Sequence, residues 1–333
     1  MVVISNSTNN IHKISIAPMM DCTDKHFRMI MRQITSKALL YTEMIVAQSL
    51  YFSDKREKFL NFNNTEHPIS IQFGGDNPKF LKEAAKMAQD WGYDEINFNV
   101  GCPSPRVSSG NFGASLMNYP YKVAKCIESL KNNSNLPITV KHRIGVDSND
   151  TFSNLNSFVK DVSSAGVDRF IVHARKAILN GLSPKENRTI PPLRYDIVEK
   201  LKEKNPDLVI EINGGFTNSK ECENALSKFD GVMIGRSAYK HPLRWSNIDN
   251  TFYQMKTSPK KASTIIFELI PYIEKCLIQE GTTWHICKHL INLVEGIPRA
   301  KAWRHKLSTK SLNKTLTITD LIELTLEIKN LGY

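Results

Sequence analysis

The sequence lacks the features that mark membrane-spanning, secreted and zinc-binding proteins. No apolar run approaches the ~20 residues needed to cross a bilayer, and no charged segment followed by an apolar one opens the chain, so we expect no signal peptide. The six cysteines include no C-x-x-C pair and no Cys/His spacing typical of zinc. Scattered thiols in 333 residues favour a reducing compartment over a disulfide framework. We therefore expect a cytoplasmic protein without a metal.

Acidic residues are also scarce. The chain has 33 Asp and Glu against 44 Lys and Arg, a formal net charge of +11. Residues 296–314 contain no acidic residue but six basic ones: Arg299, Lys301, Arg304, Lys306, Lys310 and Lys314. Trp303 and His305 lie among them, and cations interleaved with an aromatic suit contacts to phosphates and bases. The pattern favours a polyanionic partner, nucleic acid or an anionic membrane, over charge that serves solubility alone.

Short β-branched runs recur at regular spacing and alternate with helical patterns. The runs predict strands at 14–18, 39–43, 69–73, 95–100, 138–141, 169–173, 208–212 and 231–234. Apolar residues at helical spacing predict helices at 78–91, 121–130, 152–165, 196–204 and 220–226, with Asp150 and Ser219 as N-caps. Eight such units predict an α/β fold, a (β/α)8 TIM barrel. A doubly wound sheet is the alternative, disfavoured because no early G-x-G-x-x-G turn is present.

The pattern changes after Phe252. From here on the apolar spacing predicts helices and no strands, with helices at 264–279, 285–295, 298–307 and 320–331. The segment 257–261 reads as a linker. We therefore expect a flexible leader at 1–12, a barrel domain at 13–254 and a small all-α domain at 262–333.

Polar residues stand at the carboxyl ends of all the predicted strands, where barrel enzymes carry their function. They are Pro18-Met19-Met20, Glu43, Gln72, Asn99 with Cys102, Lys141 with Arg143, His173 with Arg175, Asn213-Gly214-Gly215 and Gly235-Arg236. An ion pair or a helix cap could explain any one of these groups. Eight such groups, one at the carboxyl end of each strand, predict a functional site there.

The fourth strand runs directly into a Gly-Cys-Pro turn. Glycine permits a tight backbone and proline ends the strand, so the turn presents the Cys102 thiol at the strand end. Asn97 and Asn99 alternate along the strand and should face the same side. A thiol beside amide groups suits proton transfer to a base-like heterocycle. The alternative is a small buried hydrophobe in a tight turn.

The last strand ends predict a phosphate site. Barrels commonly bind phosphate after strands seven and eight, through glycine N–H groups, and Arg236 could add charge-assisted hydrogen bonds. The amide of Gln72 could bond to the polar edge of a flat heterocycle, Lys141 could stabilise a developing anion, and His173 could donate to a phosphate or ring oxygen. Together these residues predict a phosphorylated planar cofactor across the open end of the barrel, and FMN fits this description. A Schiff-base Lys141 of an aldolase is the weaker alternative.

The residues resemble those of a known family, the tRNA-dihydrouridine synthases, and most closely its bacterial subfamily A. The matching stretches, in order, are 17–19 (APM), 40–44 (LYTEM), 72–75 (QFGG), 93–104 (YDEINFNVGCPS), 112–117 (FGASLM), 140–145 (VKHRIG), 171–176 (IVHARK), 181–188 (GLSPKENR), 213–215 (NGG), 230–236 (DGVMIGR) and 299–304 (RAKAWR). The resemblance covers the whole barrel and reaches the helical region.

The resemblance implies an FMN barrel, reduced by NADPH, that reduces the C5–C6 bond of uridines in the tRNA D-loop, at positions 20 and 20a for this subfamily. It implies Cys102 as proton donor. The FMN residues would be Ala17, Pro18, Met19, Gln72, Lys141, His173, Asn213, Gly214, Gly215, Gly235 and Arg236. The tRNA contacts would be Asn99, Lys185, Arg188, Lys301 and Arg304. We expect a monomer whose partner is tRNA, with no membrane and no metal.

Three positions depart from the family pattern. Ser115 stands where relatives often have Cys, which leaves Cys102 as the only thiol of its stretch. Lys301 stands where Arg is expected, and the two are not equivalent at bidentate sites. His142 occupies a variable place.

Two other functions remain open from the sequence. One is a flavin barrel acting on a small pyrimidine or enone, against which the basic run 296–314 argues. The other is a non-catalytic tRNA-binding protein, against which the complete set of flavin-site residues argues.

Overall fold

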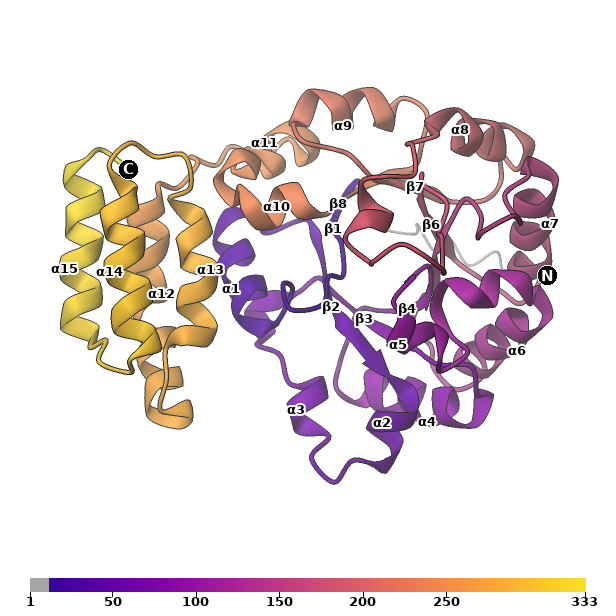
Figure 1. The fold of residues 1–333 in the computed structure, drawn as a ribbon, viewed down its shortest axis with the longest axis horizontal. Helices are drawn as coiled ribbons and strands as arrows, with labels where there is room; N and C mark the ends of the chain where they lie inside the picture. Colours follow the sequence, from indigo (N-terminus) through magenta and orange to yellow (C-terminus); the bar gives the residue numbers. More distant parts are fainter. Residues whose placement is uncertain (1–11) are drawn as a thin grey trace, which may run out of the picture.

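The computed structural model describes residues 12–333, and its first part is a closed barrel of eight parallel strands (Figure 1). The strands are β1 (Ile14–Ile16), β2 (Leu39–Val46), β3 (Ile69–Gly74), β4 (Glu95–Val100), β5 (Ile138–Arg143), β6 (Arg169–His173), β7 (Ile210–Asn213) and β8 (Gly231–Ile234). β8 closes on β1 by pairing Val232 with Ile14. The predicted (β/α)8 barrel is confirmed and the doubly wound sheet is wrong. Most of the expected leader, residues 1–11, lies outside the described residues.

Helices connect the strands and surround the barrel. They are α1 (Lys25–Ile34), α2 (Ala47–Phe52), α3 (Glu57–Leu60), α4 (Pro78–Asp90), α5 (Pro105–Ser108), α6 (Pro120–Lys131), α7 (Phe152–Ser163), α8 (Tyr195–Lys204), α9 (Ser219–Leu226), α10 (Arg236–Lys240) and α11 (Ile248–Tyr253). Short 3-10 turns are η1 (Asn64–Glu66), η2 (Gly113–Asn118), η3 (Glu186–Arg188) and η4 (Pro242–Trp245). Because all strands are parallel, their carboxyl ends open at one mouth.

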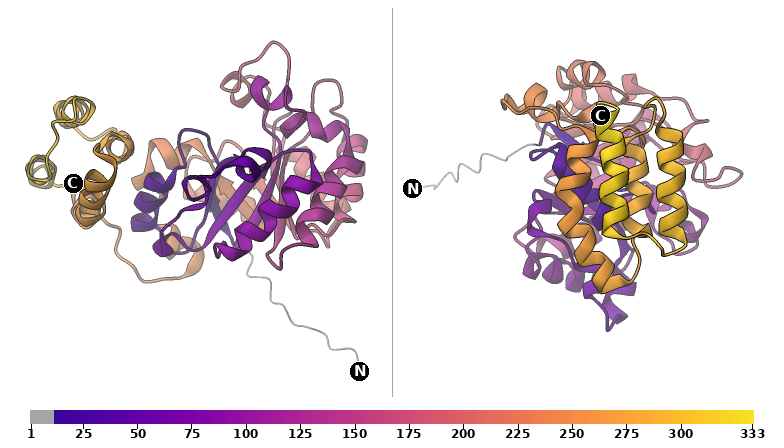
Figure 2. Two further views of the ribbon diagram at one scale, coloured as in Figure 1. Left: turned by 90° about the horizontal axis from the view of Figure 1, so that it is seen from below. Right: turned by 90° about the vertical axis from the view of Figure 1, so that its left-hand side faces the viewer.

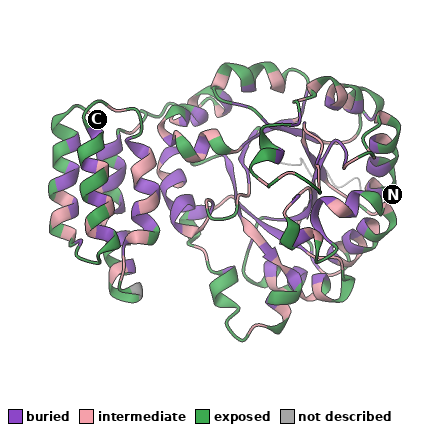
Figure 3. Cartoon of the chain, viewed as in Figure 1, coloured by how far each residue is buried: buried purple, intermediate pink, exposed green. Residues whose placement is uncertain are grey.

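The main core lies between the strands and the helices. In α6 the buried residues Val123, Cys126, Ile127 and Leu130 follow helical spacing and face the barrel. All six residues of β4 are buried, as expected for a strand covered on both faces. Figure 3 shows buried residues on the strands and on the inner faces of the helices, with exposed residues outside.

The barrel interior is partly charged. Arg169 lies 2.6 Å from Glu95 and 3.0 Å from Glu211, and all three side chains are buried. Ser15 donates to Glu211, and Tyr41 donates to Glu95 at 2.9 Å. Burial would lower the pKa of Arg169, but the carboxylates beside it raise that pKa well above its usual value. The arginine is thus held as a cation between two carboxylates.

Four helices form a bundle against the barrel, called the helical layer below: α12 (Ala262–Glu280), α13 (Trp284–Leu293), α14 (Ala300–Leu312) and α15 (Ile318–Asn330). The left view of Figure 2 shows them end-on as a bundle, and the right view shows their axes running alongside one another. A capping box at Thr317 begins α15, and Trp303 on α14 donates to the Leu324 carbonyl at 2.8 Å.

The carboxylate of Asp24 joins this layer to the barrel. It caps α1 by accepting from the N–H groups of His26 and Phe27, both at 3.0 Å. From α13, His289 Nε2 and Lys288 Nζ each lie 2.9 Å from it. Burial would raise the pKa of Asp24, but the contacts with His289 and Lys288 outweigh burial and lower it. One side chain thus orders the start of α1 and contributes to the attachment of the helical layer, beside contacts such as that of His26 with Tyr272 at 2.8 Å.

Some predicted local features are wrong. The N-caps are Thr151 and Asn218, whose side chains accept from N–H groups three residues on, and not Asp150 and Ser219. Asp150 instead pairs with Lys176 at 2.8 Å. The prediction also contains no counterpart of α1, and β2 runs three residues further than expected because its pairing with β3 shifts register between Tyr41 and Met44.

Candidate active site at the barrel mouth

The barrel mouth brings most of the sequence-predicted site residues into contact with one another. The contacting sets are Gly235 with Ala17 and Met19, Gln72 with Asn99, Lys141 with Asn213, His173 with Gly214, and Arg236 with Arg188. Pro18 lies between Ala17 and Met19 at the end of β1, and Gly215 follows Gly214 after β7. These contacts lie at the carboxyl ends of the strands, on the same side of the barrel.

The Cys102 turn is held by hydrogen bonds to its backbone. The N–H groups of Gly101 and Cys102 donate to Asn99 Oδ1 at 3.1 and 3.0 Å. The Cys102 carbonyl accepts from Ala114 at 2.9 Å. Gly113 has φ +72° and a Cβ there would lie 2.6 Å from that carbonyl, so the turn can close only over glycine. These bonds fix the backbone from which the thiol projects.

The Cys102 thiol is kept in its protonated form. It is half-buried, and burial raises its pKa above the ordinary value. A backbone N–H of Ser104 and the charges of Arg143 and Lys141 oppose this shift but do not cancel it. A thiol with a raised pKa can donate a proton but is a poor nucleophile near neutral pH.

Asn97, Asn99 and Gln72 form a buried amide group. Gln72 Nε2 donates to Asn97 Oδ1 at 2.7 Å, and Asn99 Nδ2 donates to Gln72 Oε1 at 2.9 Å. Both asparagines contact the same side chain, so they face the same side of β4, as their alternation predicts.

Lys141 projects from β5 and donates to Asn213 Oδ1 at 3.1 Å. Asn213 is itself oriented, because its Nδ2 donates to the Met233 carbonyl at 2.8 Å. Burial and then the charge of Arg143 lower the pKa of Lys141 to about 8, although Glu211 and Cys102 oppose the shift. The amine is therefore a cation that titrates close to neutral pH.

Two glycines after β7 adopt backbone conformations that exclude side chains. Gly214 has φ +120°, and a Cβ there would lie 2.8 Å from His173 Cδ2 and 2.9 Å from Leu193 Cδ2. Gly215 has φ +84°, and a Cβ there would lie 2.6 Å from Leu193 Cδ1. Tyr195 donates to the Gly214 carbonyl at 2.5 Å and fixes the turn. The turn thus packs so tightly against His173 and Leu193 that only glycine fits at both positions.

Cations surround the glycine turn. Burial and then the charges of Arg143, Lys141, Arg175 and Arg236 lower the pKa of His173 well below its usual value. Within residues 12–333, none of these four cations forms an ion pair with a carboxylate. The region consequently has a positive potential that an anion would neutralise.

Arg143, which the sequence placed at a strand end without a role, connects two parts of the mouth. Its Nε donates to the Gly101 carbonyl at 3.0 Å, and its Nη1 donates to the carbonyls of Lys176 and Asn187, both at 3.0 Å. Burial lowers the pKa of Arg143 to about 10. Its position at the end of β5 was the only sequence signal for this function.

The residues expected to contact tRNA fall on two parts of the molecule. Lys185 and Arg188 are exposed at η3, in the loop after β6, and the Arg188 carbonyl accepts from Arg236 at 2.8 Å. Lys301 is exposed and Arg304 half-buried on α14, in the helical layer. Asn99 lies inside the barrel mouth with the Cys102 turn. The structure therefore does not bring these five residues into one cluster.

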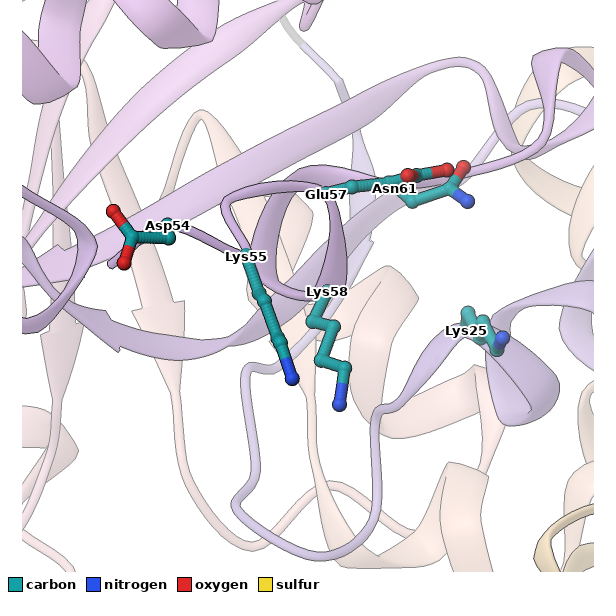
Figure 4. A pocket seen from close by; sticks show the side chains of 6 residues that line it. All are labelled: Lys25, Asp54, Lys55, Glu57, Lys58 and Asn61. Carbon is teal, nitrogen blue, oxygen red and sulfur yellow. The ribbon is translucent and has the colours of Figure 1, made fainter.

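A hollow apart from the mouth is lined by three lysines, Lys25 on α1 with Lys55 and Lys58 around α3, together with Asp54, Glu57 and Asn61. Figure 4 shows Lys55 and Lys58 extending to the same side of their loop, with Lys25 across from them. No residue of this hollow belongs to the mouth. In the part of the chain that the structure describes, no helix is long and apolar enough to cross a membrane. The same residues contain no group of three or more His, Cys, Asp or Glu placed to hold a metal.

The mouth defines the class of protein before any comparison. Cations beside a glycine turn suit a phosphate group, and a protonated thiol nearby suits proton donation. These features are typical of barrel enzymes that act with an anionic ligand. Its sequence matches the model of the family described as "Dihydrouridine synthase (Dus)" over residues 15–329.

Individual relatives agree with this match. A "tRNA-dihydrouridine(20/20a) synthase" of Synechocystis sp. is 50% identical over 304 residues, covering 91% of each chain. Proteins with the same name from Shewanella oneidensis and Pseudomonas aeruginosa are 45% and 43% identical, covering 92% and 89% of this chain and 90% and 89% of their own. The chain belongs to the dihydrouridine synthase family, and the resemblance in its motifs is confirmed.

Proposed function

We propose that this protein reduces the C5–C6 double bond of uridine in tRNA to give 5,6-dihydrouridine, with FMN as cofactor and NADPH as reductant. The observation that carries the proposal is the protonated thiol of Cys102, fixed at the mouth beside buried amides and a cationic glycine turn. The relatives' name supports positions 20 and 20a as targets.

The residues at the mouth fit FMN. The glycine turn at 214 and 215 would offer backbone N–H groups to a phosphate, and Arg236 with the neighbouring cations would balance its charge. Gln72 and Lys141, with 17–19 of the β1 end, would contact the ring system. When bound and reduced, FMN supplies the hydride that the reaction needs.

The chain's own residues would orient the uracil and supply the proton. Cys102 holds a proton on Sγ and would donate it to C5 of the uracil ring. Asn99, whose Oδ1 and one N–H are already bonded within the barrel, keeps one N–H for the target base. Lys141, oriented by Asn213, places a positive charge where negative charge develops.

The same proposal gives the helical layer a role in holding tRNA. A uridine inside folded RNA must leave its stack to reach the mouth, at a cost of a few kcal/mol. Lys301 and Arg304 on α14, with Lys185 and Arg188 beside the mouth, would offset that cost through phosphate contacts. The three-lysine hollow adds positive charge on the α1 and α3 side.

The test is dihydrouridine formation in an unmodified tRNA transcript by purified protein with FMN and NADPH. We expect Cys102→Ala to lower the rate about 10²–10⁴-fold, the usual value of a general acid. Cys22→Ala is the matched control, because Cys22 is the other half-buried thiol. A Cys102→Ala enzyme that works at the wild-type rate would refute the assignment. Free uridine converted as well as tRNA would instead favour the small-molecule reductase.

A further inference from the structure

A line of hydrogen bonds leads from the Cys102 turn into the barrel. The Cys102 N–H donates to Asn99 Oδ1 (3.0 Å), Asn99 Nδ2 donates to Gln72 Oε1 (2.9 Å), and Gln72 Nε2 donates to Asn97 Oδ1 (2.7 Å). All three amide side chains are buried. Each amide therefore receives a hydrogen bond on its oxygen and gives one from its nitrogen.

The line continues to a carboxylate. Asn97 Nδ2 donates to Thr139 Oγ1 at 2.9 Å, and the Thr139 hydroxyl donates to Glu95 Oε1 at 2.8 Å. Glu95 is paired with Arg169 at 2.6 Å, below the mouth. We call this line, from Cys102 through Asn99, Gln72, Asn97 and Thr139 to Glu95, the relay.

The two ends of the relay fix the direction of every bond between them. At the upper end the N–H groups of Gly101 and Cys102 can only donate, so Asn99 must present its oxygen to them. At the lower end the carboxylate of Glu95 can only accept, so Thr139 must present its hydrogen to it. An amide turned over anywhere between would place two donors or two acceptors in contact. Bonds aligned head to tail also polarise one another.

We propose that Thr139 and Glu95 are positioning residues that act through the relay to hold the Cys102 turn and the amides of Gln72 and Asn99 in one orientation. Neither residue stands at the mouth, because Glu95 is the first residue of β4 and Thr139 is the second of β5, far from the carboxyl ends of those strands. The proposal concerns the same site as the proposed function, and its link to catalysis rests on that function.

The relay also decides which groups remain for a ligand. Once the internal bonds are made, Asn99 has no oxygen lone pair in reserve but one N–H, and Gln72 keeps one N–H and one lone pair on Oε1. The relay thus holds a donor on each amide. Such a mouth selects ligands with carbonyl oxygens or ring nitrogens, as in a uracil or a flavin.

The test breaks the relay in its middle. Thr139→Val keeps the shape of the side chain and removes the hydroxyl, so the donor to Glu95 and the acceptor for Asn97 are lost together. The matched control is Ser70→Ala, because the Ser70 hydroxyl donates to the same Glu95 oxygen at 3.0 Å and is not part of the relay. Thr139→Ser should restore the wild-type behaviour, because it keeps the hydroxyl.

The readout is the rate at which iodoacetamide alkylates Cys102 in the full-length protein, measured by peptide mass, with Cys22 as internal reference. We expect Thr139→Val to react at Cys102 about three- to tenfold faster than wild type, the effect of one lost hydrogen bond on the turn. Ser70→Ala should match wild type, and the rate at Cys22 should not change in any variant. Equal rates at Cys102 in the Thr139→Val and Ser70→Ala proteins would overturn the proposal.

A second measurement separates this proposal from the proposed function. In tRNA reduction we expect Thr139→Val to lower kcat about tenfold with KM for tRNA unchanged, because the acid is misplaced while docking is intact. If wild type forms no dihydrouridine, the proposed function fails while the alkylation result still decides on the relay. Thr139→Cys, close in size but a weak donor and acceptor, weakens the relay should the valine variant not fold, and the same increase in alkylation at Cys102 is then expected in smaller measure.

Discussion

Replacing Gly214 with alanine tests the glycine turn, because the structure gives the size of the conflict. Its φ of +120° is a conformation that costs an L-residue about 1–2 kcal/mol. The new Cβ would also lie 2.8 Å from His173 and 2.9 Å from Leu193, and relieving such overpacking costs about 1–3 kcal/mol more. We therefore expect Gly214→Ala to lower the free energy of unfolding by roughly 2–5 kcal/mol.

The same change should impair the cofactor site. To accept a Cβ, the turn or His173 must move, and a phosphate held by the turn would lose its alignment. We expect the affinity for FMN to fall at least about tenfold, equivalent to about 1.4 kcal/mol. Urea titration measures the first effect, and flavin fluorescence titration of the apoprotein measures the second.

Gly166→Ala is the matched control. Gly166 has φ +92°, but its Cβ would meet only the flexible Lys131 side chain at 3.7 Å, and it precedes β6 at the end of the barrel away from the mouth. The Gly166→Ala variant should lose only the conformational part of the free energy of unfolding, about 1–2 kcal/mol. Its affinity for FMN should equal that of the wild type. If both variants lose the same stability and Gly214→Ala keeps wild-type FMN affinity, the reasoning about the turn is wrong.

Three further predictions follow from charges. Because the pKa of Lys141 is lowered to about 8, the amine loses its charge above that pH, so FMN affinity should decline as pH rises past 8; fluorescence titration should show no such decline for Lys141→Arg. Asp24→Asn keeps the cap of α1 but loses the carboxylate contacts to α13, and we expect a loss of about 1–3 kcal/mol in urea titrations. Since folding lowers the pKa of Asp24, this difference in the free energy of unfolding should be complete above the unfolded pKa of about 3.9 and be lost progressively as pH falls from there through the lower folded-state pKa. Lys301→Ala with Arg304→Ala should weaken tRNA binding and lower its salt slope by about one per lost phosphate contact, whereas exposed Lys329→Ala on α15 should change neither in filter binding.

The sequence was sufficient for the barrel and for the position of the Cys102 turn. Both depend on local patterns, namely β-branched runs, glycine and proline at the turn, and polar residues where strands end. The alternation of Asn97 and Asn99 also correctly predicted that they face one side. The one-residue errors at the caps of α7 and α9 arose because Thr151 and Asn218 stand beside Asp150 and Ser219, which are equally good capping types.

The relay and the attachment of the helical layer could not be predicted in this way. Glu95 meets Arg169 from 74 residues away, and Asp24 meets His289 from 265 residues away. A charged residue in a strand or helix is normally assigned to the surface, and only the closed barrel places its partner against it. The role of Arg143 could not be predicted either. Its three partners are backbone carbonyls, which every residue type has, so no side chain in the sequence indicates them.

The guanidinium of Arg143 has a mechanical consequence. It is bonded at the same time to the Cys102 turn, through Gly101, and to the loop that carries Lys185 and Arg188, through Asn187. The loop cannot be displaced without breaking a bond of the side chain that braces the turn. Arg143 therefore couples the loop proposed to contact the RNA to the turn that carries the proposed proton donor, so that a change in the loop can reach the donor without passing through the substrate.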